Sequence, residues 1–165
     1  MSPVDTLREP DLLRQVEAFI YREARLQDEH LYAEWEALWT DDGVYWVPAN
    51  GDGGDPEAEM SIIFDNRSRI GVRVRQLLSG KRFAQMPASR LRRLISNIEI
   101  LSVEGDELLA AGNSLVFEST PRGDTLWAAR VEYRLRRIDG ALRLARKKVV
   151  LVNNDKALFS LSFLI

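Results

Sequence analysis

The second half of the chain alternates apolar and polar side chains over long segments, and this alternation limits the fold more than any other feature. In residues 127–136 the five odd positions are apolar and four of the five even positions are charged. A period of two predicts a strand with one buried and one solvated face. We expect further long strands over 91–103, 108–118 and 142–151, joined by turns at 104–107, 120–124 and 139–140.

The last of these strands changes its pattern part-way along. Leu142 and Leu144 occupy even positions, whereas Val149 and Leu151 occupy odd positions. Since side chains alternate strictly in a strand, one extra residue near Arg146 would keep all four on the same face. The pattern therefore predicts a β-bulge that bends the strand.

The first half predicts helices and two short strands. A helical spacing of apolar residues runs from Leu12 to Ala24, with a candidate capping box at Thr6 and Glu9 and with Pro10 in the first turn. A second, short helix would place Leu31, Trp35, Leu38 and Trp39 on one face and end at Asp41-Asp42-Gly43. Short strands are expected over 44–48 and 60–64, separated by a flexible loop over 50–56.

A third helix is expected to begin at Asp65 or Asn66, either of which could cap it. Its buried side would carry Ile70, Val74, Leu77 and Leu78, and Gly80 would end it. Three N-terminal helices followed by a long, bent antiparallel sheet indicate the α+β class, within a single domain over residues 1–165. This arrangement resembles the cone-shaped fold that nuclear transport factor 2 shares with ketosteroid isomerase and scytalone dehydratase.

Two residue counts exclude several kinds of active site. The chain has no cysteine and one histidine, His30. It therefore has no thiolate for a zinc site, an iron–sulfur cluster or a cysteine nucleophile. One copy also cannot supply the two histidines of a two-His-one-carboxylate iron site. If the protein takes part in redox chemistry, we expect a partner to carry the metal.

The charges are unevenly distributed along the chain. Residues 1–65 hold 16 acidic and 4 basic residues, a net charge of −12, whereas residues 66–165 hold 9 acidic and 19 basic residues, a net charge of +10. The basic segment 67–93 could bind nucleic acid, but its apolar residues recur at core spacing and the overall isoelectric point is 5.6. We expect the two halves to meet inside the fold or across a subunit interface.

Three segments of the chain resemble the small (beta) subunit of aromatic-ring-hydroxylating dioxygenases. Residues 23–48, EARLQDEHLYAEWEALWTDDGVYWVP, are similar to the helix–helix–strand signature of that family. Residues 89–100, SRLRRLISNIEI, are similar to its Ser-Arg-x-Arg-Arg segment, and residues 133–155, YRLRRIDGALRLARKKVVLVNND, to its last hairpin. Their order is that of the family, and they look most like its benzoate, toluate and anthranilate branch.

The resemblance implies a non-catalytic structural subunit of an oxidoreductase that degrades aromatic compounds. In this family the large (alpha) subunit holds the Rieske 2Fe-2S cluster and the mononuclear iron and receives the electrons, and the small subunit has no cofactor. Three small subunits associate with one another and with three large subunits. The resemblance also implies ion pairs or caps for Glu23, Arg25, Asp28 and Glu29. The residues expected at a partner interface are Arg90, Arg92, Arg93 and Trp46.

The competing hypothesis is a cofactor-free isomerase or dehydratase of the ketosteroid isomerase or scytalone dehydratase kind. Such a site needs a base in an apolar pocket and a hydrogen-bond donor for an enolate. Asp41 or His30 are the candidate bases, although Asp41 lies in a turn pattern and His30 follows charged residues that predict a solvated side chain. The candidate donors are Tyr21, Tyr32 and Tyr45.

The two ends of the chain lead to two further expectations. Residues 1–10 lack the apolar stretch of a secretory signal, and no segment holds the roughly 20 apolar residues that span a bilayer, so we expect a cytoplasmic protein that binds neither membranes nor nucleic acid. Residues 157–165, ALFSLSFLI, are too apolar for a free tail. We expect them to dock as a final strand or in an interface, with the Ile165 carboxylate reaching solvent or an arginine.

Overall fold

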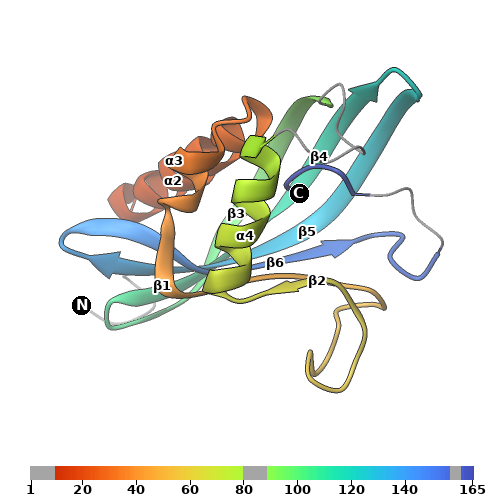
Figure 1. Cartoon of the computed structure of the whole chain (residues 1–165). Coiled ribbons are helices and arrows are strands. Elements are labelled where there is room, and N and C mark those ends of the chain that lie inside the picture. Colours follow the sequence, from red (N-terminus) through yellow and green to blue (C-terminus); the bar gives the residue numbers. More distant parts are fainter. Residues whose placement is uncertain (1–9, 80–88, 157–160) are drawn as a thin grey trace.

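A six-stranded sheet with helices on one face forms the molecule (Figure 1). The computed structural model describes residues 10–79, 89–156 and 161–165. The helices of these residues are α2 (Pro10–Asp28), α3 (Tyr32–Glu36) and α4 (Arg67–Ser79). The strands are β1 (Trp39–Pro48), β2 (Ser61–Asp65), β3 (Arg90–Glu104), β4 (Glu107–Thr120), β5 (Gly123–Ile138) and β6 (Ala141–Leu151). We call the face of the sheet away from the helices the outer face.

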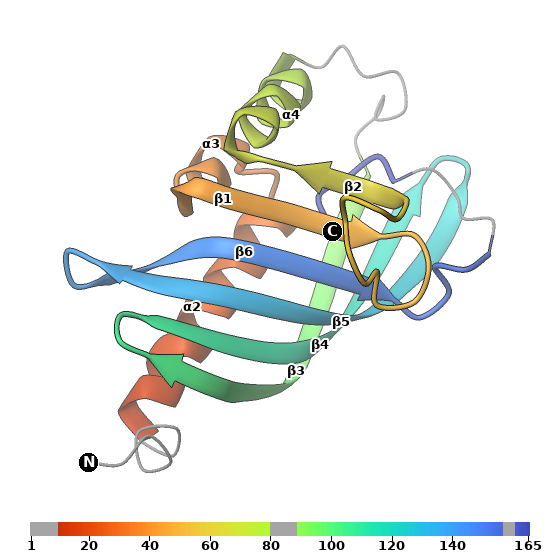
Figure 2. The same cartoon turned by 90° about the horizontal axis from the view of Figure 1, so that it is seen from below.

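The sheet confirms the expected α+β class and differs from the expectation in one pairing. Its strand order is β2-β1-β6-β5-β4-β3, and Figure 2 shows α2 behind this sheet. Consecutive strands from β3 to β6 are antiparallel hairpin partners, as their turn signals predicted. However, β1 pairs with β6 in parallel, so the sheet is mixed rather than wholly antiparallel. Local turn signals could not reveal this pairing because the two strands are far apart in sequence.

Irregularities in β6 and β3 bend the long strands around the helices. In β6, Arg134 pairs with Arg146 and Leu135 pairs with Leu144, which leaves Ala145 as an extra residue and confirms the predicted bulge. In β3 the register shifts between Ser96 and Glu99, where Asn97 has a positive φ of 55°. Gly112 of β4 faces this bend, and a Cβ atom there would lie 3.1 Å from the Ser96 main-chain oxygen. The two bends curve the sheet into a cone.

The helices α2 and α4 follow their predicted patterns, with one exception in α4. α2 begins at Pro10, while the candidate capping box at Thr6 and Glu9 lies outside the described residues. Asn66 caps α4, since its side-chain oxygen accepts a hydrogen bond of 2.9 Å from the main-chain nitrogen of Arg69. Leu78, predicted to be buried, is 59% exposed because the last turn of α4 leaves it beyond the sheet-facing stripe. Gly80 lies outside the described residues. None of the described helices is long and apolar enough to cross a bilayer.

The predicted boundary at Asp41-Asp42-Gly43 is wrong. α3 already ends at Glu36, and these three residues lie within β1, which begins at Trp39. Asp42 is held there by Thr40, whose hydroxyl donates to it over 2.7 Å, and by Arg136 of β5, whose guanidinium donates over 2.9 and 3.1 Å. The hydrogen bond from Arg136 is the main reason why the pKa of Asp42 falls from 3.8 to about 2. The three residues form an irregular stretch of β1, since the register with β6 shifts between Trp39 and Val44.

The last described residues fill the space between the helices and the sheet. Phe163, Leu164 and Ile165 are all buried, and the Phe163 ring lies edge-on to Trp127 with 5.7 Å between the ring centroids. The segment 161–165 is not a strand, so that part of the expectation is wrong. Its main-chain groups bind side chains of α2, β1 and β3 instead of a sheet edge. Residues 157–160 lie outside the described part.

We predict that Leu164→Ala lowers the free energy of unfolding by about 2–5 kcal/mol, the range for a leucine truncated in a packed core. Leu164 is 2% exposed. The matched control is Leu78→Ala, which removes the same atoms from a side chain that is 59% exposed and should change stability by less than about 0.5 kcal/mol. Chemical denaturation followed by circular dichroism measures both. Equal effects of the two substitutions would contradict the docking of residues 161–165.

Candidate functional site

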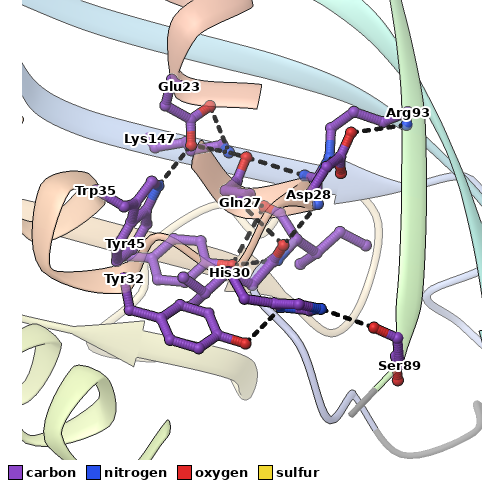
Figure 3. Close-up of polar contacts among 12 residues, drawn as sticks. Glu23, Gln27, Asp28, His30, Tyr32, Trp35, Tyr45, Ser89, Arg93 and Lys147 are labelled. Atoms are coloured by element: carbon purple, nitrogen blue, oxygen red, sulfur yellow. Dashed lines mark hydrogen bonds and ion pairs between the residues drawn. The ribbon is translucent and has the colours of Figure 1, made fainter. Parts of the chain in front are cut away.

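A cluster of charged and amide side chains lies inside the cone, where an apolar pocket would be needed for catalysis (Figure 3). Its members come from one face of α2, from β3 and from β6. We call them the buried polar cluster: Glu23, Gln27, Asp28, Arg93 and Lys147. All five are less than 9% exposed, so each must find its hydrogen-bond partners within the protein.

Glu23 and Lys147 form the first of two buried ion pairs. The Lys147 ammonium lies 2.9 Å from both carboxylate oxygens of Glu23. The Trp35 indole donates to the same carboxylate over 2.7 Å. Burial lowers the pKa of Lys147, and the negative charge of Glu23 opposes that shift. Because the pair is almost fully desolvated, either charge alone would be strongly unfavourable here.

Asp28 and Arg93 form the second pair and bind the end of the chain. The Arg93 guanidinium donates to Asp28 over 2.7 Å, and the Arg93 main-chain nitrogen donates to the other carboxylate oxygen over 3.0 Å. A further nitrogen of the guanidinium donates over 3.0 Å to the main-chain oxygen of Leu164. This contact joins α2, β3 and the segment 161–165.

Gln27 connects the two ion pairs. Its side-chain oxygen accepts hydrogen bonds from Lys147 over 3.2 Å and from Arg93 over 2.9 Å. Its nitrogen donates to the main-chain oxygens of Leu164 and Ile165 over 3.1 and 3.3 Å. The Gln27 amide therefore accepts hydrogen bonds from two cations and donates to two carbonyl oxygens. An ionised side chain could not do both, because a carboxylate only accepts and a cationic group only donates.

Tyr45 completes the contacts of the last residue. Its hydroxyl donates to the Ile165 oxygen over 3.2 Å and accepts from the Ile165 nitrogen over 2.9 Å. The Ile165 oxygen thus meets Tyr45 and Gln27, whereas we had expected solvent or an arginine. Burial raises the pKa of Tyr45 well above 10.0, so its hydroxyl keeps its hydrogen at neutral pH.

His30 and Tyr32, two candidates of the isomerase hypothesis, lie together beside this cluster. The Tyr32 hydroxyl is 2.6 Å from His30 Nδ1, and His30 Nε2 is 2.8 Å from the Ser89 main-chain oxygen. A carbonyl can only accept, so Nε2 carries a hydrogen and Nδ1 accepts from Tyr32 in the neutral ring. The expectation of a solvated His30 is wrong, because both ring nitrogens are hydrogen-bonded within the protein and the residue is half-buried.

The other candidates of that hypothesis do not join them. Asp41 is exposed at the start of β1, and Tyr21 is 49% exposed on α2. Both ring nitrogens of His30 are engaged, which leaves no lone pair directed at a substrate. The space facing Tyr45 holds Ile165. The arrangement therefore positions the chain's own last residues rather than a reacting molecule.

Lys147 and Gln27 were not predicted from the sequence as members of the site. Lys147 has the same strand parity as Val149 and Leu151, which point into the core, and this parity could have placed it inside. Gln27 lies seven residues after Ile20 and three after Ala24, so its helical spacing could have placed it on the buried side of α2, although polar residues near a helix end are ordinarily solvated.

The four residues predicted at a partner interface occupy different environments. Arg90 and Arg92 are exposed on β3, whereas Arg93 is used inside the cone. Trp46 is 1% exposed, although it points to the outer face. Arg146 and Lys148 lie over its ring, 5.0 and 4.6 Å from the ring centroid. The interface role of these residues stays a prediction.

The predicted ion pairs of α2 are present, and they show how the two charged halves meet. Glu23 and Asp28 bind Lys147 and Arg93, and Arg25 pairs with Glu29 over 3.3 Å on the surface. Two further pairs join the acidic part to α4: Arg67 to Glu36 and Arg73 to Asp65. Within residues 10–79, 89–156 and 161–165, no group of three or more His, Asp or Glu side chains could hold a metal ion.

Comparison with known proteins shows consistent similarities. Residues 22–155 match the family described as "Ring hydroxylating beta subunit". The small oxygenase component of the p-cumate 2,3-dioxygenase system of Pseudomonas putida is 34% identical over 139 residues, which cover 83% of this chain and 77% of that protein. The small subunit of the 2-halobenzoate 1,2-dioxygenase of Burkholderia cepacia is 31% identical over 144 residues, which cover 84% and 87%.

Solved structures agree in fold. The beta subunit of the benzoate 1,2-dioxygenase from Burkholderia mallei has a TM-score of 0.73 at 26% identity, and the alignment covers 84% of this chain and 89% of that one. An NTF2-like protein with a cystatin-like fold from Novosphingobium aromaticivorans has a TM-score of 0.60 at 19% identity, over 91% and 88% of the two chains. The second likeness shows the expected cone-shaped fold alone.

We predict that Glu23→Gln lowers the free energy of unfolding by about 3–5 kcal/mol, because it leaves Lys147 buried without a counter-charge. Glu29→Gln makes the same chemical change in a side chain that is 42% exposed and paired with Arg25. This control should cost less than about 0.5 kcal/mol. Urea denaturation at neutral pH compares the two, and a cost below 1 kcal/mol for both, roughly the value of an exposed pair, would show that the buried pair is dispensable.

A pH-dependent effect is expected from Tyr133, whose pKa burial raises well above 10.0. Above pH 10 the unfolded chain loses this proton and the folded chain keeps it, so the wild type loses stability relative to Tyr133→Phe. The difference in unfolding free energy should change by at most about 1.4 kcal/mol per pH unit. Denaturation of both proteins at pH 8 to 11, around the ordinary value of 10.0, measures it. A constant difference would mean that Tyr133 ionises in the native state.

Proposed function

The chain belongs to the family of the beta subunits of aromatic-ring-hydroxylating dioxygenases, which are parts of oxidoreductase complexes, and we propose that its own role is structural. In this proposal it supports a large subunit that carries out the reaction. The observation that carries the proposal is the content of the cone: two buried ion pairs and residues 163–165 occupy the interior. A cofactor-free isomerase would need an accessible base there.

The redox cofactors are proposed to lie in the large subunit. A Rieske 2Fe-2S cluster takes two cysteines and two histidines, and the mononuclear iron of ring oxygenases takes two histidines and a carboxylate. With no cysteine and a single histidine, this chain does not fit either group. Electrons would accordingly reach the oxygen-activating iron through the large subunit, without passing through this chain.

We further propose an assembly of three large and three small subunits, in which the small subunits also contact one another. The exposed Arg90 and Arg92 offer charged hydrogen-bond donors for such contacts. Arg146 and Lys148, which lie over the Trp46 ring, form a second basic surface for them. Arg93 contributes indirectly, since it holds β3 in place from inside.

An aromatic carboxylate is the proposed class of substrate for the whole complex. The relatives include small subunits from systems named for p-cumate, toluate and 2-halobenzoate, all of which are aromatic carboxylates. The substrate would bind in the large subunit, because the interior of this chain is filled.

We expect the purified chain to contain no stoichiometric iron and to show no oxygenase turnover, and the complex co-expressed with its large subunit to have both. Iron analysis, size-exclusion chromatography with light scattering and oxygen consumption with an aromatic carboxylate measure these properties. Turnover by the chain alone, or a chain that never co-purifies with the large subunit, would refute the proposal.

A second test separates a structural role from a catalytic one. Tyr32→Phe and Asp41→Asn each remove a side-chain group that an isomerase-type site would use. We expect the complex containing either variant to keep its kcat per iron. A fall in kcat at unchanged complex mass and iron content would assign chemistry to this chain and would contradict the structural role.

A further inference from the structure

The outer face carries an exposed apolar area at the β3–β4–β5 end of the sheet. We call it the apolar patch: Leu94, Leu115, Phe117, Leu126 and Val152, which are 69%, 40%, 43%, 61% and 76% exposed. Isolated exposed leucines are ordinary, but contiguous ones on a sheet face mark an interaction surface.

Strand register shows that the patch is continuous. Leu94 pairs with Leu115, and Leu115 pairs with Ala128. One row further along, Phe117 pairs with both Arg92 and Leu126. Directly paired residues point to the same face of a sheet, so these side chains form two adjacent rows across three strands. Val152 extends the first row, since its nitrogen donates to the Ala128 oxygen over 3.0 Å.

The patch is bordered by cations without acidic partners. Arg90, Arg92 and Arg130 are exposed on the same face, and no ion pair involves them among the residues that the structure describes. An isologous contact would bring the Arg92 side chains of two copies toward one another across an apolar centre. Like charges brought together in this way oppose association.

The complementary surface lies at the opposite edge of the same sheet. The loop between β1 and β2 carries only acidic charges, and exposed apolar residues follow at its end and at the start of β2. We call the loop together with the start of β2 the acidic loop: Asp52, Asp55, Glu57, Glu59, Met60 and Ile62. Met60 is 76% exposed and Ile62 37%. No ion pair within the described ranges uses its carboxylates, and Figure 1 shows the loop projecting on the side away from the helices.

We propose that the apolar patch of one copy binds the acidic loop of a second copy. Arg90, Arg92 and Arg130 then meet carboxylates, and the patch covers Met60 and Ile62. The contact is head-to-tail, because each copy uses one surface of each kind. Repeated head-to-tail contacts close into a ring when the rotation between copies permits it. The number of copies, three, rests on the proposed function, whereas the pairing of the two surfaces does not.

Charge reversal on either side of the contact should weaken it. Arg92→Glu alters the patch, and Glu57→Lys with Glu59→Lys alters the loop. Each should raise the dissociation constant for self-association by roughly 10-fold or more, and high salt should weaken the wild type in the same direction. Arg14→Glu and Asp106→Lys with Asp41→Lys reverse exposed charges elsewhere and are the matched controls. Sedimentation velocity of the purified chain measures the masses, and circular dichroism confirms that each variant is folded.

A mixing experiment distinguishes a head-to-tail contact from any other. The patch variant keeps its loop and the loop variant keeps its patch, so an equal mixture holds one intact pair of surfaces for every two chains. We expect this mixture to associate, because the intact patch meets the intact loop and the two reversed surfaces also carry opposite charges, while each variant alone stays monomeric. A second reversal that combines Arg92→Glu with the loop changes in one chain should recover part of the self-association.

Three results would overturn the inference: a wild-type chain that stays monomeric at low salt, variants that associate like the controls, or a mixture of the two variants that stays monomeric. If Arg92→Glu abolished co-purification of the large subunit but left self-association intact, the patch would serve the large subunit instead. That result would overturn the inference and leave the proposed function standing. Conversely, normal self-association without any binding of the large subunit would refute the proposed function alone.

Discussion

The rest of the structure depends on the buried polar cluster, in which the acidic half of the chain meets the basic half. Glu23 and Asp28 on α2 bind Lys147 of β6 and Arg93 of β3, and Gln27 links both pairs to the chain's last residues. Buried ion pairs add little net stability over well-packed apolar residues, because desolvation offsets the attraction. They do penalise every packing in which a charge loses its partner. We interpret the cluster as the feature that sets one position of α2 across the curved sheet.

The bend of β6 was readable from the sequence because it follows from a strict local rule, whereas the bend of β3 at Asn97 was not predicted. Alternation in β5 predicted a long strand, and the change of parity in β6 predicted a bulge near Arg146, which the structure places at Ala145. Side chains alternate strictly in a strand, so apolar residues that change parity can share one face only if an extra residue is inserted. The start of α4 was likewise predicted at Asp65 or Asn66 from their short, hydrogen-bonding side chains, and Asn66 is the residue that caps the helix. These features need only neighbouring residues to form.

Where the prediction was wrong, partners distant in sequence overrode a local preference. Asp41-Asp42-Gly43 has the composition of a turn, yet it lies within β1, where Asp42 pairs with Arg136 from 94 residues away. Arg93 belongs by composition to an exposed basic run, yet it is buried and binds Asp28 of α2. His30 was expected in solvent, yet its ring binds Ser89 and Tyr32. In each case at least one polar partner is distant in sequence, and a single sequence does not identify such a partner.

The contact between Gln27 and Leu164 spans 137 residues, and it has a consequence for the timing of synthesis. During translation, α2 emerges early, but two acceptors of Gln27 and one of Arg93 arrive only with residues 164 and 165. At about 5–20 residues per second the ribosome delivers these last ligands several seconds after the helix they bind. The contacts of Gln27 and Arg93 with residues 164 and 165 are therefore among the last contacts of the fold to form. A chain that ended before residue 164 would keep the two buried ion pairs of α2 but would lack the main-chain acceptors that residues 164 and 165 supply to Gln27 and Arg93.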